Sequence, residues 1–204
     1  MTESEFTQKM KSGNLCLHPT DSLPGIGFHP LLPDARDRME GVKGNRDAKG
    51  FLALAADLEM AKSFWSPLPV GWESRLERLW PGPLTVVWQA AETAPPALVR
   101  GDGTLALRVP KLTRNDWLLQ AIREFGLPLP SSSVNAPGMS PKPNLQEAEA
   151  HLASTGTSFF KMDRSVEEWV DRPPSLPSTI IKIDSDGSFR LLRQGLVPAE
   201  SINV

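Results

Sequence analysis

Apolar residues occur in short runs along this chain, and the runs are separated by turns rich in proline, glycine and acidic side chains. Short continuous apolar runs that are bounded by such turns are typical of strands in the interior of a sheet. The run at residues 51–56 is apolar throughout, which indicates a strand covered on both faces. Strands are predicted at residues 15–18, 26–28, 51–56, 84–88, 104–109, 127–130, 158–162, 179–183 and 189–192.

Helices are predicted between most of these strands. Pro33-Asp34 predicts a helix start with an acidic N-cap, Asp57 caps the next helix, and Thr113 to Asp116 resembles a capping box. Asp186-Gly187 predicts the turn of a hairpin between the last two strands. The alternation predicts a single α/β domain over residues 1–204, with a twisted, mostly mixed sheet flanked by helices. Helices are expected at residues 34–42, 57–64, 72–80, 113–125 and 144–152, and residues 1–12 form a short polar helix or a frayed end.

Composition narrows the class of protein without identifying it. Among the 204 residues, 40% are hydrophobic and 23% are charged, as in an ordinary soluble globular protein. The net charge of −2 gives no global attraction to nucleic acid, so any basic surface must be local. The single Cys16 excludes a disulfide framework and lies in an apolar run, which predicts a core position. No apolar run reaches the ~20 residues of a membrane span, so no membrane partner is expected and cytoplasm is the expected location.

The polar stretch from Pro128 to Gly138 is the densest group of small donors and acceptors in the chain. Ser131, Ser132, Ser133 and Asn135 follow an apolar run, and their residue types predict a loop that leaves a strand. In open α/β sheets ligands bind beyond the carboxyl ends of strands, and hydroxyls beside free backbone N–H groups suit an oxyanion. On this segment alone, a polar turn without a ligand is the commoner explanation.

Several common site motifs are absent. The chain has no phosphate-binding Gly-rich loop with Lys-Ser/Thr and no serine framed as Gly-x-Ser-x-Gly. The pattern from Gly101 to Ala106 matches the dinucleotide glycine spacing but precedes a strand, which predicts a turn. His18, His29 and His151 are widely spaced and lack carboxylate partners at helical spacing, which argues against zinc.

Four cationic residues stand at positions where a ligand is expected. Lys43 and Arg46 follow a predicted helix and Arg193 follows the last strand, although each of the three is also explained as a solvated surface charge. Arg108 differs because it lies inside an apolar strand, where a buried charge requires a partner or an anion.

Seven segments, in order, resemble motifs of the YrdC-like threonylcarbamoyl-AMP synthase family. Each segment alone is weak evidence, but their common order over about residues 13–195 makes the resemblance specific. The segments are Pro19–Ile26, Lys43–Gly50, Trp80–Thr85, Ala106–Pro110, Ser131–Gly138, Pro177–Ile181 and Arg193–Gly195.

The resemblance implies a nucleotidyltransferase that forms threonylcarbamoyl-AMP and pyrophosphate from L-threonine, bicarbonate or CO2, and ATP. It further implies Mg²⁺ with the ATP, and a tRNA-modification machinery that receives the adenylate. By resemblance, the ATP and phosphate contacts are Lys43, Arg46, Ser131, Ser133, Asn135 and Arg193. By resemblance, the threonine contacts are Thr20, Ser22, Arg108 and Ser178. Neither a protein metal ligand nor a nucleophile is predicted, so catalysis is expected to rest mainly on positioning.

This chain departs from the family pattern at four positions. Pro24 stands where the family has a tyrosine, Asn45 displaces Arg46 by one residue, and Val134 and Pro137 replace small or hydroxyl residues. Two alternatives therefore stay open. One is a diverged paralogue that binds nucleotide, tRNA or double-stranded RNA in the same cleft without synthesis, and the other is a carbamoyl-adenylate enzyme with a different acceptor.

Overall fold

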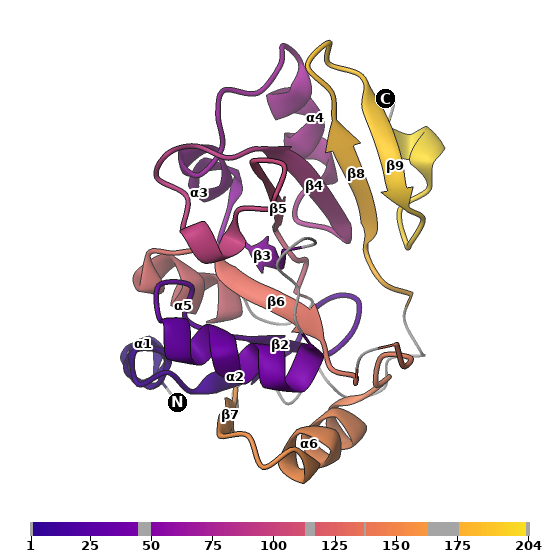
Figure 1. Cartoon of the computed structure of the whole chain (residues 1–204). Helices are drawn as coiled ribbons and strands as arrows, with labels where there is room; N and C mark the ends of the chain where they lie inside the picture. The colour runs from indigo at the N-terminus through magenta and orange to yellow at the C-terminus, as the bar shows by residue number, and fades with distance from the viewer. Residues whose placement is uncertain (1, 45–49, 113–116, 137, 163–175, 203–204) are drawn as a thin grey trace.

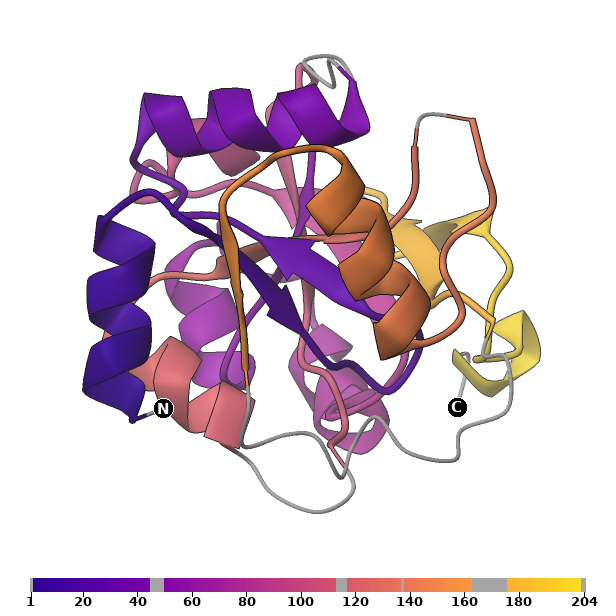
Figure 2. The ribbon, with the colours of Figure 1, turned by 90° about the horizontal axis from the view of Figure 1, so that it is seen from below.

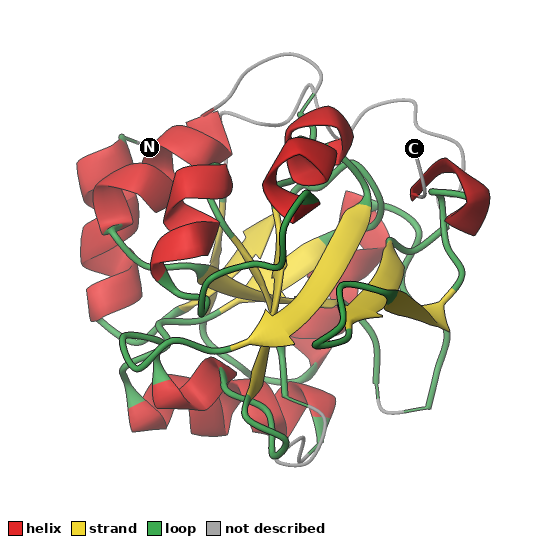
Figure 3. Cartoon of the chain, turned by 90° about the horizontal axis from the view of Figure 1, so that it is seen from above, coloured by secondary structure: helices red, strands yellow, loops and turns green. Residues whose placement is uncertain are grey.

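The computed structural model describes residues 2–44, 50–112, 117–136, 138–162 and 176–202. Within these ranges the chain forms one sheet with helices on both sides (Figures 1 and 3). The helices are α1 (Glu3–Lys11), α2 (Pro33–Lys43), α3 (Leu58–Ser63), α4 (Trp72–Leu79), α5 (Trp117–Phe125) and α6 (Leu145–Ser154), with 3₁₀ turns η1 (Pro96–Leu98) and η3 (Ala199–Ile202). The strands are β1 (Leu15–His18), β2 (Gly25–Gly27), β3 (Leu52–Leu54), β4 (Leu84–Gln89), β5 (Thr104–Arg108), β6 (Leu129–Ser133), β7 (Phe159–Lys161), β8 (Thr179–Ile183) and β9 (Phe189–Arg193).

The strand order across the described sheet is β7-β1-β2-β6-β3-β5-β4-β8-β9. The pairs β1–β7, β3–β5 and β4–β8 are parallel, and the remaining neighbouring pairs are antiparallel. The mixed sheet with flanking helices confirms the predicted fold class. Its first and last elements, α1 and η3, lie at opposite ends of the molecule (Figures 1 and 2).

Helices α1 and α5 cover one face of the sheet. Phe6 of α1 makes edge-to-face contacts with Trp117 and Phe125 of α5, with ring centroids 6.1 and 6.0 Å apart. Cys16 of β1 points to this face and is fully buried, which confirms its predicted core position. Its neighbours in β1 belong to the cluster on the opposite face, because successive strand residues alternate between faces.

The tryptophan-rich segment forms a large part of the core on the opposite face. Trp65 and Trp80 stack with their ring centroids 5.8 Å apart, and Trp72 and Trp88 are also buried. Each indole N–H has an acceptor: Trp65 Nε1, for example, donates to the carbonyl oxygen of Leu105 at 3.0 Å. These contacts satisfy the polar edge of the ring inside an apolar core. The segment is therefore part of the hydrophobic core.

The structure corrects the predicted loop at Ser131–Ser133. These residues form the second half of strand β6, which pairs with β2 on one side and β3 on the other. Serine and proline are poor strand formers, but tertiary pairing overrides propensity in the middle of a sheet. The neighbouring strand β2 supplies the necessary space, since an added methyl group on Gly27 would lie 2.6 Å from the carbonyl oxygen of Pro130. The prediction that Ser131–Ser133 form a loop was therefore wrong.

The helix starts were predicted with mixed success. Asp57 caps α3 as expected, because its Oδ1 accepts a hydrogen bond from Met60 N at 2.8 Å. Helix α2 instead has Leu32 as its N-cap and Pro33 in its first turn, so Asp34 is not a cap. The predicted box at 113–116 lies outside the described residues. Among the described helices, none combines the length and apolar character that crossing a membrane requires.

Candidate functional site

A cavity of about 630 Å³ opens over the centre of the sheet. Alternate residues of β3 (Leu52 and Leu54) and of β5 (Ala106 and Arg108) line it, because residues i and i+2 of a strand share a face. The lining includes seven residues with hydroxyl groups: Thr20, Ser22, Thr85, Ser131, Ser132, Ser133 and Ser178. Seven of the ten predicted site residues lie in this lining: Thr20, Ser22, Arg108, Ser131, Ser133, Ser178 and Arg193.

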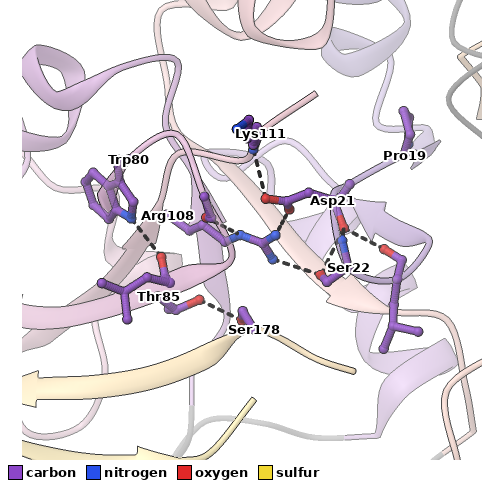
Figure 4. Close-up of polar contacts among 12 residues, drawn as sticks. Pro19, Asp21, Ser22, Trp80, Thr85, Arg108, Lys111 and Ser178 are labelled. Atoms are coloured by element: carbon purple, nitrogen blue, oxygen red, sulfur yellow. Dashed lines mark hydrogen bonds and ion pairs between the residues drawn. The ribbon is translucent and has the colours of Figure 1, made fainter. Parts of the chain in front are cut away.

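Arg108, at the end of β5, is a buried cation whose partners come from two other segments (Figure 4). Its Nε donates to the carbonyl oxygen of Gly82 at 3.2 Å, its Nη1 donates to Ser22 Oγ at 2.9 Å, and its Nη2 forms an ion pair with Asp21. Asp21 also accepts the backbone N–H of Lys111 at 2.9 Å. Burial, and to a lesser degree the charge of Arg193, lower the pKa of Arg108 to about 9, so the group remains a cation at neutral pH. The required partner of this buried charge is therefore Asp21.

The turn that carries Asp21 and Ser22 is fixed by its own hydroxyl groups. Thr20 Oγ1 donates to the carbonyl oxygen of Leu23 at 2.8 Å and accepts the N–H of Ser22 at 3.0 Å. Such side-chain bonds to nearby backbone groups are the reason that Ser and Thr favour turns. They hold Ser22 where its oxygen meets the guanidinium of Arg108.

A second cationic group, Arg193 at the end of β9, lies beside Ser178. The guanidinium donates to the carbonyl oxygen of Ser178 from Nε at 3.1 Å and from Nη2 at 2.8 Å. Ser178 Oγ lies 2.9 Å from Thr85 Oγ1, a lining residue that we did not predict (Figure 4). The glycine of the Arg-x-Gly segment is required for close packing, since a methyl group on Gly195 would overlap the carbonyl oxygen of Pro177.

Arg100 also lines the cavity, and the sequence did not single it out. It packs against Gly50, where an added methyl group would lie 2.9 Å from its Cγ. Across the part of the chain that the structure describes, neither Arg100 nor Arg193 is paired with a carboxylate, and the described lining contains no Asp or Glu. The cavity wall is therefore cationic although the chain carries a net charge of −2. Such a wall attracts anions.

Lys43 and Asn135 do not lie in the described lining. Lys43 is buried at the end of α2 and donates from Nζ to Ser133 O at 2.7 Å, Asn135 O at 3.1 Å and Asn135 Oδ1 at 2.6 Å. Ser133 Oγ also donates to Asn135 Oδ1, at 2.9 Å. The two residues therefore hold the end of β6 in place. Arg46 lies outside the described residues.

His18 contacts Ser131 of the cavity wall but is not itself in the lining. Nothing in the sequence indicated this contact, because His18 stands apart from the other histidines. Its ring is fully buried, with Nδ1 3.1 Å from Pro19 O and Nε2 3.2 Å from Ser131 Oγ. Burial, with a smaller contribution from the positive charge of Arg108, lowers the pKa of His18 to about 4, although the hydrogen bond to Pro19 acts in the opposite direction. The imidazole is therefore neutral at physiological pH.

No metal site is evident in the described ranges, where no group of three His, Cys, Asp or Glu side chains is placed to hold an ion. The lining offers arginines and hydroxyls, and Asp21 is paired with Arg108. This donor set does not suit Mg²⁺, which prefers carboxylate oxygens. We assign no protein ligand to the Mg²⁺ that the resemblance implied.

Comparison with known proteins places this site in a family. The model of the Sua5/YciO/YrdC domain, described as "Telomere recombination", matches residues 8–195. Two relatives named threonylcarbamoyl-AMP synthase are 35% identical over 132 residues (Nitrosococcus oceani; 65% of this chain, 70% of the relative) and 29% identical over 146 residues (Halorhodospira halophila; 72% and 75%).

Solved structures share the fold. Sua5 of P. abyssi, determined in complex with L-threonine, matches all of this chain and 57% of its own length with a TM-score of 0.80 at 23% identity. YciO of E. coli has a TM-score of 0.78 at 19% identity, covering 98% of this chain and 94% of YciO. The chain thus spans less than two thirds of the P. abyssi protein but nearly all of YciO. On the family model and the 35% identical relative, the chain belongs to the Sua5/YciO/YrdC family.

Proposed function

We propose that this protein is an L-threonylcarbamoyladenylate synthase. The observation that carries the proposal is the cavity, whose described wall combines Arg100, Arg108 and Arg193 with seven hydroxyl residues and no carboxylate. Both reactants that must meet in the cavity, a threonine carbamate and ATP, are anionic. The names of the relatives and the threonine complex of P. abyssi Sua5 support the same choice of substrates.

The proposed reaction has two balanced steps. The neutral amino nitrogen of L-threonine attacks the carbon of CO2 and releases a proton to solvent, or attacks bicarbonate, whose hydroxide leaves with that proton as water; either route gives a carbamate. A carbamate oxygen then attacks the α-phosphorus of ATP, the bond between the α-phosphorus and the bridging oxygen breaks, and pyrophosphate leaves. Negative charge grows on the phosphoryl oxygens during this step, and fixed cations near them stabilise it.

The two substrates are assigned to different arginines of the cavity wall. Arg108 uses three of its five N–H groups for Gly82, Ser22 and Asp21, and its Nη2 is buried. We assign the second N–H of Nη1 to the carboxylate of threonine. Arg193 has an Nη1 group that the contact with Ser178 does not use, and we assign it, with Arg100, to the phosphates. Fixed donors of this kind hold a substrate in a reactive geometry.

Lys43 and Asn135 take a different role in this proposal from the one that the resemblance implied. Because Lys43 Nζ is bonded to three oxygen atoms of Ser133 and Asn135, it supports the wall of the cavity. A direct contact of Lys43 with phosphate would require these bonds to be exchanged. The contributions of Arg46 to ATP binding and of Ser133 to the nucleotide remain predictions.

The test is pyrophosphate release by the purified chain with ATP, L-threonine and bicarbonate, with threonylcarbamoyl-AMP identified by mass spectrometry. We expect release that depends on both threonine and bicarbonate. Omission of bicarbonate after degassing is the matched control. Release of pyrophosphate that does not depend on threonine would contradict the proposal.

A second candidate is a diverged paralogue that binds nucleotide or double-stranded RNA without synthesis. The observation that favours it is Pro24, which stands in place of the family tyrosine and whose carbonyl oxygen accepts the N–H of Val134 at 3.3 Å. ATP binding by calorimetry without threonine-dependent pyrophosphate release supports this candidate. Filter binding with tRNA and double-stranded RNA then decides between its nucleotide and RNA forms.

A further inference from the structure

The His18–Ser131 pair joins a fully buried histidine to a serine of the cavity wall. His18 Nδ1 lies 3.1 Å from the carbonyl oxygen of Pro19, and Nε2 lies 3.2 Å from Ser131 Oγ. A carbonyl oxygen only accepts hydrogen bonds, so Nδ1 must carry the hydrogen. The contact with Pro19 thus fixes the tautomer of the ring.

The neutral ring in turn fixes the hydroxyl group of Ser131. Burial keeps His18 neutral at physiological pH, so Nε2 has a free lone pair and accepts. The hydroxyl hydrogen of Ser131 therefore points toward His18, away from the cavity. The lone pairs of Ser131 Oγ are the part of this group that a ligand can reach.

This orientation has a consequence for the ligand. Phosphate and carboxylate oxygens are hydrogen-bond acceptors, and they gain no hydrogen bond from an oxygen that presents only lone pairs. An N–H or O–H group does gain one. Ser131 also lies at the Arg108 end of the cavity, because its partner His18 is hydrogen-bonded to Pro19, next to the turn whose Asp21 and Ser22 contact the guanidinium.

We propose that His18 is a positioning residue that makes Ser131 a hydrogen-bond acceptor for an N–H or O–H group of the amino-acid substrate. The inference rests on the proposed function, since it takes threonine as the ligand at the Arg108 end. It moves Ser131 from the phosphate contacts that the resemblance implied to the amino-acid contacts.

The packing around the pair supports a specific arrangement. Gly25 faces both partners, and a methyl group there would overlap the ring of His18 and lie 2.9 Å from Ser131 Oγ. Only a residue without a side chain leaves the ring in contact with the serine. A serine beside a histidine is also the arrangement of an activated nucleophile, but a ring with a pKa of about 4 is a weak base.

The first experiment compares binding of L-threonine and of ATP by isothermal titration calorimetry with the full chain. Ser131→Ala is expected to weaken threonine binding roughly 2- to 12-fold, the range for one hydrogen bond between neutral groups, and to leave ATP binding unchanged. Weaker ATP binding with unchanged threonine binding would overturn the proposal. Labelling of Ser131 by a fluorophosphonate probe would overturn it too, because it would show a nucleophile.

The second experiment separates positioning from packing. His18→Gln places a carbonyl oxygen within reach of Ser131 and is expected to bind threonine like the unaltered chain, whereas His18→Met is expected to weaken binding as Ser131→Ala does. His151→Gln, on α6 and outside the cavity lining, is the control, and thermal melting checks that each variant folds. Equal threonine affinity of the Gln and Met variants would refute a positioning role.

The outcomes also distinguish this inference from the proposed function. If the unaltered chain binds no threonine, the proposed function is wrong, and threonine is not the molecule whose N–H or O–H group Ser131 accepts. If it binds threonine and the variants do not differ, only the role of His18 fails. ¹⁵N spectra of the imidazole give a further readout: a ring protonated at Nε2 at neutral pH overturns the orientation of Ser131 with or without threonine.

Discussion

Acidification is expected to destabilise the protein through His18, and the magnitude follows from its burial. The ordinary pKa of 6.5 applies to the unfolded chain, and the folded pKa is about 4, a difference of about 2.5 pH units. At 1.36 kcal/mol per unit, protonation costs the folded state about 3.4 kcal/mol in total. Because the folded pKa is the lower one, the unfolded state binds the proton first. The stabilisation is therefore complete above pH 6.5 and is lost as the pH falls toward 4.

Between pH 7 and pH 5 the expected loss from His18 alone is roughly 2 kcal/mol in the free energy of unfolding. Urea unfolding at pH 7, 6 and 5, followed by the fluorescence of the six tryptophans, measures this quantity. The matched control is His18→Gln, which cannot titrate and should lose roughly 2 kcal/mol less over the same interval. Carboxylates with lowered pKa values, such as Asp57 and Asp102, contribute to both proteins and cancel in the comparison.

Parallel stability curves for the unaltered chain and His18→Gln would refute this reasoning. Such a result would mean that His18 is not a buried neutral ring in the folded protein. The orientation assigned to Ser131 would then lose its basis as well.

Three further predictions concern the cavity wall. Arg193→Ala should raise the KM for ATP about 10-fold or more, because a hydrogen bond to a charged group is lost. Arg193→Lys should retain part of the affinity for ATP, since the positive charge remains. Equal steady-state kinetics of the two variants would contradict the assignment of Arg193 to the phosphates. Gly25→Ala should lower the free energy of unfolding by about 1–3 kcal/mol, because the added methyl group overpacks the contact with His18. Gly41→Ala is the control: its methyl group enters open space on α2, and alanine should raise the free energy of unfolding by about 0.5–1 kcal/mol in the same urea assay. Asp21→Asn should lower the free energy of unfolding by about 3 kcal/mol, because it leaves the buried guanidinium of Arg108 without its carboxylate. Asp184→Asn, which removes an exposed ion pair, should lower it by less than about 1 kcal/mol. Equal melting temperatures of the two variants would contradict the prediction for Asp21.

The residues that the sequence identified most readily were those whose local context was unusual. Arg108 stood out because a charge interrupts an apolar strand, and the structure places it in the cavity with a buried partner. Arg100 gave no such signal, because it lies in a polar turn where arginine is ordinary. Its place in the cavity wall is evident only from the fold, in which it packs against Gly50.

Strand β6 shows why local pattern was insufficient at the centre of the site. Ser131 to Ser133 have low strand propensity, and Pro130 lacks an N–H for the ladder, so the segment resembled a loop. Its strand conformation comes from β2 and β3 on either side, which are close in space but distant in sequence. The same pairing brings His18 of β1 near Ser131, a contact that no spacing along the chain predicts.

One acidic residue makes the arginines of the proposed site electrostatically different from one another. Asp21 neutralises Arg108, whereas among the described residues no carboxylate pairs with Arg100 or Arg193. An amino acid brings both a negative and a positive group and needs little net charge from the wall. A triphosphate brings only negative charge and is best held by cations without counter-ions. In our proposal it is therefore Asp21, more than Arg108 itself, that suits the surroundings of Arg108 to threonine and leaves Arg100 and Arg193 to ATP.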